Sequence, residues 1–315
     1  MNYIQQAYTG KLGYWKYFII PGLFLGMMAL QFLMIQVLDL DVDAIIRKEV
    51  ASKGKNRFLI ESLVPMAIAL GALFFWVKYI HGQTITSLTT SRKKIDWKRI
   101  WFSFFLWGIL SSALVLVDYI VSPEHYLFNF ELVPFLFLAA IAIVLVPIQT
   151  SFEEYLFRGY LMQGIGVMAK NRWLPLVITS VIFGVMHIAN PEVGKIGYFI
   201  MVYYIGTGFF LGIITLMDEG LELALGFHAA NNLFTALLVT ADWTAFQTHS
   251  ILKDVSDPLE FSVFQIILPV FVVFPILLFI FSKRYKWNNW QDKLFGKIEE
   301  VPTEAVNNDI ENARL

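Results

Sequence analysis

Eight apolar stretches, separated by short polar segments, divide the chain of 315 residues. A helix that crosses a bilayer needs about 20 apolar residues at a rise of 1.5 Å each. We therefore predict an all-α fold, a polytopic bundle of transmembrane helices near residues 15–38, 58–80, 101–121, 133–163, 174–190, 196–217, 221–241 and 261–282. The fourth stretch is too long for a simple span and should tilt or protrude. The fifth is short, so seven spans result if one segment is re-entrant.

Composition supports a protein of the lipid bilayer. Hydrophobic residues make up 57% of the chain and charged residues 16%, whereas soluble domains carry roughly 25% charged residues. The net charge of −1 predicts no nucleic-acid partner. The chain has no cysteine, which excludes disulfides, thiol catalysis and cysteine-ligated zinc.

The distribution of Lys and Arg predicts a multi-pass protein of the inner (plasma) membrane with both termini in the cytoplasm. With this orientation, the inner segments hold more Lys and Arg than the outer ones, because five of them lie in residues 92–99. The loop 39–57 also carries five such residues and argues weakly against the assignment. After the last span, we expect Trp287, Trp290 and Phe295 to anchor a segment at the membrane interface.

The sequence SFEEYLFRGY places three ionisable residues in the fourth apolar stretch. Glu154 and Arg158 are i, i+4 neighbours on a helix, so they should pair. Glu153 is turned about 100° away and has no local partner of opposite charge. An unpaired carboxylate at membrane depth needs a partner from another helix or a function, and this makes Glu153 a candidate general base. The structural alternative is the solvated end of a helix.

Two further apolar stretches contain polar residues. His187 follows Phe183 by four residues in the fifth stretch, and His228 and Asn232 share a helix face in the seventh. Taken singly, each is typical of a hydrogen bond between packed helices. Counted from the predicted cytoplasmic ends, Glu153, His187 and the His228–Asn232 pair all lie roughly 10–20 Å into the membrane. This common depth favours a shared site. His81, His125 and His249 fall in predicted loops and should be solvated.

The order EExxxR, FxxxH and HxxxN on successive apolar segments resembles the CAAX protease and bacteriocin-processing (Abi) family, also called type II CAAX prenyl endopeptidases. The resemblance rests on Glu153, Glu154, Arg158, Phe183, His187, His228 and Asn232. It implies an intramembrane endopeptidase in which Glu153 and His187 activate water, while His228 and Asn232 bind the oxyanion. Glu154, Arg158 and Phe183 would support these groups. It also implies four parts: N-terminal helices (1–132), a catalytic core (133–241), a C-terminal helix (242–284) and a polar cytoplasmic tail (285–315).

The sequence leaves alternatives open for the cofactor and for the substrate. Glu153, His187 and His228 could ligate zinc, yet the chain lacks an HExxH motif, so we favour a mechanism without a cofactor. The expected substrate is a peptide or membrane protein, with or without a lipid, in a bacterial cell. The competing hypotheses are a non-catalytic peptide-binding or immunity protein, a proton-coupled transporter and a haem site on His187 and His228.

Overall fold

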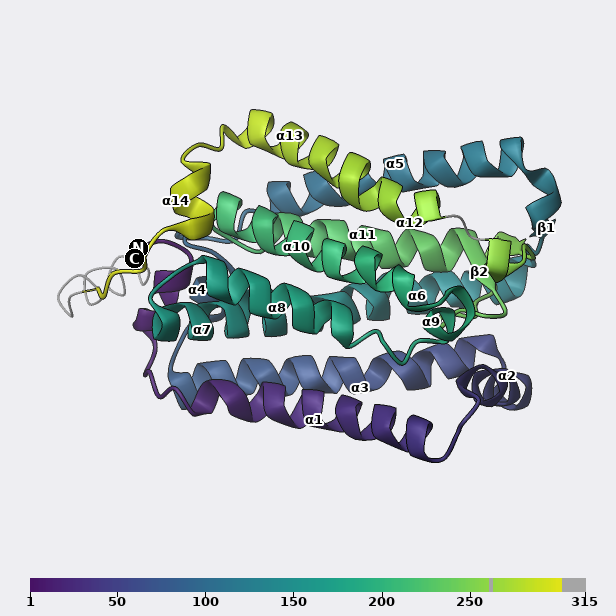
Figure 1. The fold of residues 1–315 in the computed structure, drawn as a ribbon, viewed down its shortest axis with the longest axis horizontal. Coiled ribbons are helices and arrows are strands. Elements are labelled where there is room, and N and C mark those ends of the chain that lie inside the picture. The colour runs from purple at the N-terminus through teal and green to yellow at the C-terminus, as the bar shows by residue number, and fades with distance from the viewer. Residues whose placement is uncertain (261–262, 302–315) are drawn as a thin grey trace.

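The protein is a bundle of long, roughly antiparallel helices, seen here in a computed structural model that describes residues 1–260 and 263–301 (Figure 1). Helices α1 (Lys16–Val37) and α3 (Lys55–Phe75) form one side of the bundle. The opposite side is formed by α5 (Trp97–Val121), α12 (Val263–Leu268) and α13 (Phe274–Tyr285). Between them lie α6 (Leu132–Glu154), α8 (Trp173–Val185), α10 (Met201–Asp218) and α11 (Glu222–Leu238). The predicted all-α membrane fold is confirmed.

Short elements connect the long helices. The α-helical ones are α2 (Val42–Lys53), α4 (Ile85–Thr89), α7 (Met162–Ala169), α9 (Pro191–Ile196) and α14 (Trp290–Phe295). The 3₁₀ and π elements are η1 (Ile4–Thr9), η2 (Trp76–His81), η3 (Pro123–His125), η4 (Tyr155–Leu161), η5 (Tyr198–Ile200), η6 (Pro258–Glu260) and η7 (Pro269–Val273). A small sheet of order β1-β3-β2 joins Tyr126–Phe128, Leu252–Asp254 and Val239–Ala241, and no sequence pattern predicted it.

All eight predicted stretches coincide with helices, and two of these helices are shorter than a full span. Among the described residues, six helices are long and apolar enough to cross a membrane. The longest runs without a break from residue 132 to 169, through α6, η4 and α7. The fifth predicted span is α8, which has only 13 residues because it ends at Val185 and a turn follows. The seventh is α11, which has 17 residues and carries His228 and two asparagines on its surface.

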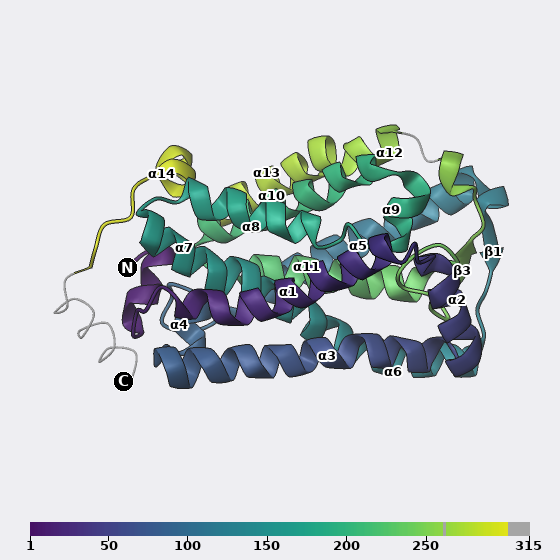
Figure 2. The ribbon, with the colours of Figure 1, turned by 60° about the horizontal axis from the view of Figure 1, so that its bottom comes forward.

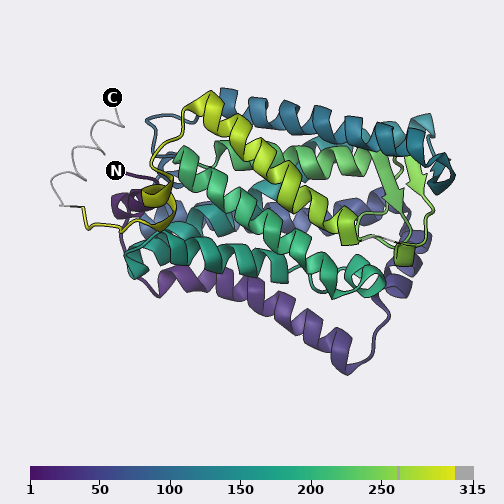
Figure 3. The same ribbon diagram turned by 45° about the horizontal axis from the view of Figure 1, so that its top comes forward.

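The two ends of the bundle are formed by different elements. The N-terminus, α4, α7 and α14 lie at one end, which we call the terminal end (Figures 1 and 3). The strands, α2 and α9 lie at the other (Figure 1). The segments predicted to be cytoplasmic therefore share the terminal end, and its side of the membrane remains a prediction. The last part of the predicted tail, residues 302–315, lies outside the described residues.

The bundle has an apolar face and a tightly packed interior. Leu23, Met27 and Leu30 of α1 are exposed, as expected for side chains that contact lipid. Inside, a β-carbon added at Gly208 would collide with the carbonyl oxygen of Ser180, and one at Gly226 with that of Ile100. These glycines let α10 approach α8 and α11 approach α5. The close packing thus holds α8 and α11, which carry predicted site residues, against their neighbours.

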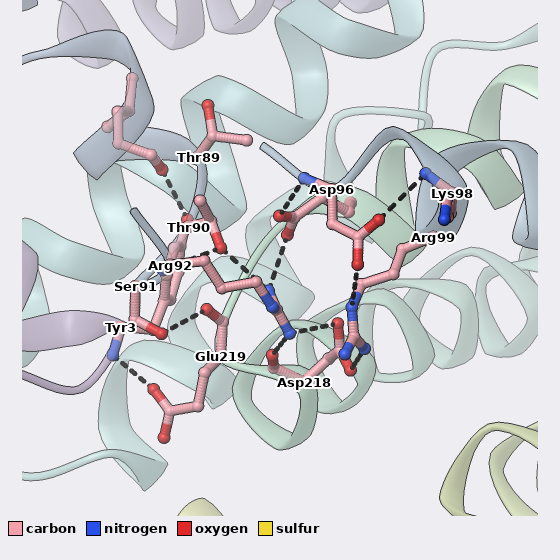
Figure 4. Close-up of polar contacts among 12 residues, drawn as sticks. Tyr3, Thr89, Thr90, Ser91, Arg92, Asp96, Lys98, Arg99, Asp218 and Glu219 are labelled. Atoms are coloured by element: carbon pink, nitrogen blue, oxygen red, sulfur yellow. Dashed lines mark hydrogen bonds and ion pairs between the residues drawn. The ribbon is translucent and has the colours of Figure 1, made fainter. Parts of the chain in front are cut away.

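A cluster of charged residues closes the terminal end, and we call Arg92, Asp96, Arg99, Asp218 and Glu222 the end cluster. Figure 4 labels the first four of them. The two carboxylates at positions 218 and 222 are buried, and the other three residues are half-buried. Arg92 contacts Asp218 at 3.0 Å and Glu222 at 3.1 Å, and Arg99 contacts Asp218 at 2.5 Å. Trp287, predicted to be an interfacial anchor, donates to Asp218 Oδ1 at 3.1 Å. The end cluster ties the loop before α5 to the turn between α10 and α11.

The prediction that His81 is solvated is wrong. His81 ends the π-helical turn η2 and is fully buried. Its Nε2 atom lies 2.8 Å from the Tyr160 hydroxyl and its Nδ1 atom 3.1 Å from the Lys11 carbonyl. Both partners come from distant parts of the sequence, so local hydropathy could not indicate the burial. His125 and His249 are half-buried.

Candidate active site

The two glutamates lie where the long fourth helix changes its winding. Glu153 and Glu154 end α6, and the π-helical segment η4 begins at the next residue. Single π-helical turns inside α-helices are frequent at functional sites. Both glutamates are buried, as are Phe183 on α8 and His228 on α11. Three helices therefore bring the three predicted motifs to one place.

Glu154 and Arg158 form the predicted ion pair. Arg158 Nη1 donates to Glu154 Oε1 at 2.9 Å, and both side chains are fully buried. Arg158 Nη2 also donates to the carbonyl of Gly208 at 3.2 Å. The guanidinium lies over the Phe183 ring, with 4.0 Å between its central carbon and the ring centroid. These contacts connect η4 to α8 and α10, and the supporting role of Glu154, Arg158 and Phe183 stays a prediction.

Glu153 has a partner that the sequence analysis missed. Gln149 lies one turn earlier on α6 and donates through Nε2 to Glu153 Oε1. The other carboxylate oxygen, Oε2, is buried without a hydrogen-bond partner and lies 3.7 Å from His228 Nε2, which is too long for a hydrogen bond. The spacing of four residues between Gln149 and Glu153 was the available signal in the sequence. An uncharged amide alone gives no reason to single out this residue.

His228 and Asn232 occupy the facing surface of α11. His228 Nδ1 lies 2.7 Å from Glu154 Oε1, the same oxygen that Arg158 contacts. The His228 ring also meets the Phe183 ring edge to face, with centroids 5.8 Å apart. One turn on, Asn232 Nδ2 donates to Gln149 Oε1 at 3.3 Å. Gln149 therefore joins Glu153 to Asn232.

His187 lies beyond the end of α8 and contacts Phe183, which belongs to the site. Its Nδ1 atom is 2.8 Å from the Phe183 carbonyl oxygen, and the two rings lie 5.1 Å apart. The imidazole stacks on Tyr204 of α10, with 4.5 Å between centroids and 13° between planes. Within the part of the chain that the structure describes, no hydrogen bond joins His187 to Glu153.

The residues of the zinc alternative do not form a ligand set here. In residues 1–260 and 263–301, no three or more His, Asp or Glu side chains are placed to hold a metal ion. His187 is oriented by a backbone carbonyl, and the nearest contact of His228 is with Glu154 rather than Glu153. The choice between a metal-free and a zinc mechanism stays a prediction.

Comparison with known proteins identifies the family. Residues 132–234, which include all seven motif residues, match the family described as type II CAAX prenyl endopeptidase Rce1-like. The chain is also 32% identical over 253 residues to the uncharacterized protein YyaK of Bacillus subtilis (strain 168), covering 76% of this chain and 83% of that protein. No solved structure matches. The chain is thus a multi-pass membrane protein that belongs to the CAAX protease and bacteriocin-processing family, a family of proteases.

Proposed function

We propose that the protein is an intramembrane endopeptidase in which Glu153 is the general base that activates water. The observation that carries this proposal is the difference between the two glutamates. Glu154 is bonded to Arg158 and His228, whereas the hydrogen-bond partner of Glu153 is an uncharged amide. Gln149 holds Oε1, while Oε2 is buried without a hydrogen-bond partner. A buried carboxylate is costly unless it is paired or has a function. Oε2 is therefore the atom available to take a proton from water.

The charges of the neighbouring groups support His228 as an oxyanion donor. Two ionised glutamates and Arg158 leave one negative charge, which a protonated His228 would neutralise. A carboxylate only accepts hydrogen bonds, so the 2.7 Å contact with Glu154 places a proton on His228 Nδ1. In the protonated ring, Nε2 also carries a hydrogen, which it can donate to a developing oxyanion together with the free N–H of Asn232.

His187 is suited to accept a proton. A backbone carbonyl only accepts hydrogen bonds, so the contact with Phe183 places a proton on Nδ1 and leaves a lone pair on Nε2. His187 would act with Glu153 on the water, as the resemblance implies, if substrate binding brings the two groups together. Catalytic hydrogen bonds are often completed only in the substrate complex.

The proposed reaction is hydrolysis of a peptide bond. As the water oxygen bonds to the carbonyl carbon, Glu153 takes a proton from the water, and the carbonyl electrons move to the oxygen. His228 and Asn232 hold this oxyanion. When it collapses, the carbon–nitrogen bond breaks and the amine leaves with the proton from Glu153. The substrate would be a peptide or membrane protein, with or without a lipid, cleaved at the plasma membrane by a protein whose termini face the cytoplasm.

The test is proteolysis in liposomes with a library of lipidated and unlipidated peptides. We expect the native protein to cleave at least one peptide, and Glu153→Ala and His228→Ala to lose that cleavage. A chelator should leave the native activity unchanged. Inhibition by the chelator that zinc reverses would refute the metal-free mechanism, and cleavage by Glu153→Ala would refute the assignment of the base. Glu61→Ala, which changes an exposed glutamate on α3, is the control.

A further inference from the structure

A cavity of about 470 Å³ lies at the end of the bundle opposite the termini. Its walls come from the last turns of α1, the start of α2 and the chain from residue 188 to 198, which includes α9. Figure 2 shows α1 running toward α2 at this end of the bundle. The residues that matter here are Asp43, Ile188, Asn190, Gly194 and Lys195. None of them was among the predicted site residues.

The cavity begins where the candidate active site ends. Ile188, the residue directly after His187, is part of its wall. Asn190 is also in the wall, and its side chain donates to Glu192 Oε1 at 3.1 Å. The same glutamate oxygen accepts the Tyr204 hydroxyl at 2.7 Å, and Tyr204 stacks on His187. A short chain of contacts therefore connects the cavity wall to the imidazole.

The chemistry of the wall fits a peptide better than a hydrocarbon chain. Asp43 on α2 and Lys195 on α9 form an ion pair of 3.1 Å, and Asp43 also pairs with Arg47 at 2.9 Å. Peptide-binding sites combine apolar area with a few placed polar groups. By contrast, a groove of about 480 Å³ between α1, α7 and α8 has apolar side chains on all sides, among them Leu25, Ile165 and Ile178. The groove offers nothing to a peptide backbone.

We propose that this cavity binds the polar segment of the substrate that flanks the scissile bond. The proposal rests on the proposed function, because it names the part of the substrate that lies beside His187. A peptide in the cavity would contact the 188–195 segment, whose contacts with Tyr204 hold the imidazole. Binding there would thus place the scissile bond and orient His187 in one step.

Two glycines allow a matched pair of substitutions that tests the binding of peptide in the cavity. A β-carbon added at Gly194, in the cavity wall, meets no atom within 4 Å, and the same is true at Gly71 on α3, outside the cavity. Gly194→Trp should therefore narrow the cavity, while Gly71→Trp adds the same bulk elsewhere. We expect Gly194→Trp to raise KM for the best library peptide about tenfold with little change in kcat, which is the pattern of lost substrate binding. Equal KM values for the two variants would overturn the proposal.

A second measurement does not depend on catalysis. Because the chain has no cysteine, Gly194→Cys and Gly71→Cys each introduce a single thiol. In the Glu153→Gln background, the pooled peptide library should slow maleimide labelling of the thiol at position 194 and not at position 71. Protection without cleavage by the native protein would refute the peptidase and keep the binding site. Cleavage by the native protein without protection would refute the binding site alone.

Discussion

Two clusters of acidic and basic residues, each with buried carboxylates, lie in different parts of this protein, and their hydrogen bonding differs. In the end cluster, Asp218 accepts hydrogen bonds from Arg92, Arg99 and Trp287. Glu222 accepts from Arg92 and from the backbone N–H of Asp96. Each carboxylate oxygen of these two residues has a donor, so the end cluster has the features of a structural ion-pair network.

The central cluster, which comprises Gln149, Glu153, Glu154, Arg158 and His228, is incompletely bonded. Glu153 Oε2, Glu154 Oε2 and Arg158 Nε are buried without hydrogen-bond partners. Unsatisfied buried groups cost free energy, and a folded protein retains them mainly where they have a function. In these two clusters, complete bonding accompanies the structural role, and unbonded polar atoms accompany the proposed catalytic role.

The largest expected effect is on catalysis by Glu153→Gln. The amide keeps the shape of the side chain and removes the base, so cleavage should fall by about 10²- to 10⁴-fold. Thermal stability in detergent should not decrease, because the change removes a charge whose burial costs free energy. Glu222→Gln is the matched change in the end cluster, where stability should fall and cleavage per folded molecule should persist. If both variants fold normally and both lose cleavage, the distinction between the clusters is wrong.

The next largest effect should be the loss of stability in Asp218→Ala. This change removes the partner that Arg92 and Arg99 share, while each arginine keeps a second carboxylate partner. The expected cost is therefore about 1–3 kcal/mol, that of a buried hydrogen-bonding group that loses its partner. Unfolding in denaturant would measure the change in free energy. The fraction that remains folded should cleave peptide at the native rate. A normal stability would show that the end cluster is dispensable for the fold.

The sequence predicted the parts of the site that depend on position along one helix. The i, i+4 pairing of Glu154 with Arg158 follows from helix geometry and is present. The common depth of the motifs predicted that Glu153, His187 and the His228–Asn232 pair share a site. The structure brings His228 to the glutamate pair, whereas His187 contacts Phe183 and Tyr204. Both inferences needed only the helical rise and the order of the segments.

Contacts between distant segments could not be predicted in this way. Tyr204 stacks on His187 from another helix, and no pattern in the sequence pairs them. The end of α8 at Val185 was missed because the residues of the following turn are also largely apolar. Hydropathy therefore overestimated the length of this helix, and it located His187 inside a span rather than in the turn that places it.

A smaller effect should follow from Gln149→Leu. Losing the amide removes a donor from Glu153 and an acceptor from Asn232, so cleavage should fall about 10- to 100-fold, as for other residues that orient a reactive group. Thr150→Val is the control, since Thr150 is buried on the same helix and bonds only to backbone carbonyls. In a double-mutant cycle, Gln149→Leu should add little to Asn232→Ala. Additive losses would mean that Gln149 does not act through Asn232.

The smallest effect on stability and cleavage should come from the loss of the solvent-exposed ion pairs of Lys53. Lys53 contacts Glu49 at 2.5 Å and Glu61 at 2.9 Å, distances as short as those in the end cluster. All three side chains are about a third or more exposed, and exposed pairs contribute little because water and salt screen them. We therefore expect Lys53→Ala to change neither the unfolding transition nor the cleavage rate. A marked loss of stability would show that short distance, rather than burial, determines what an ion pair contributes to this fold.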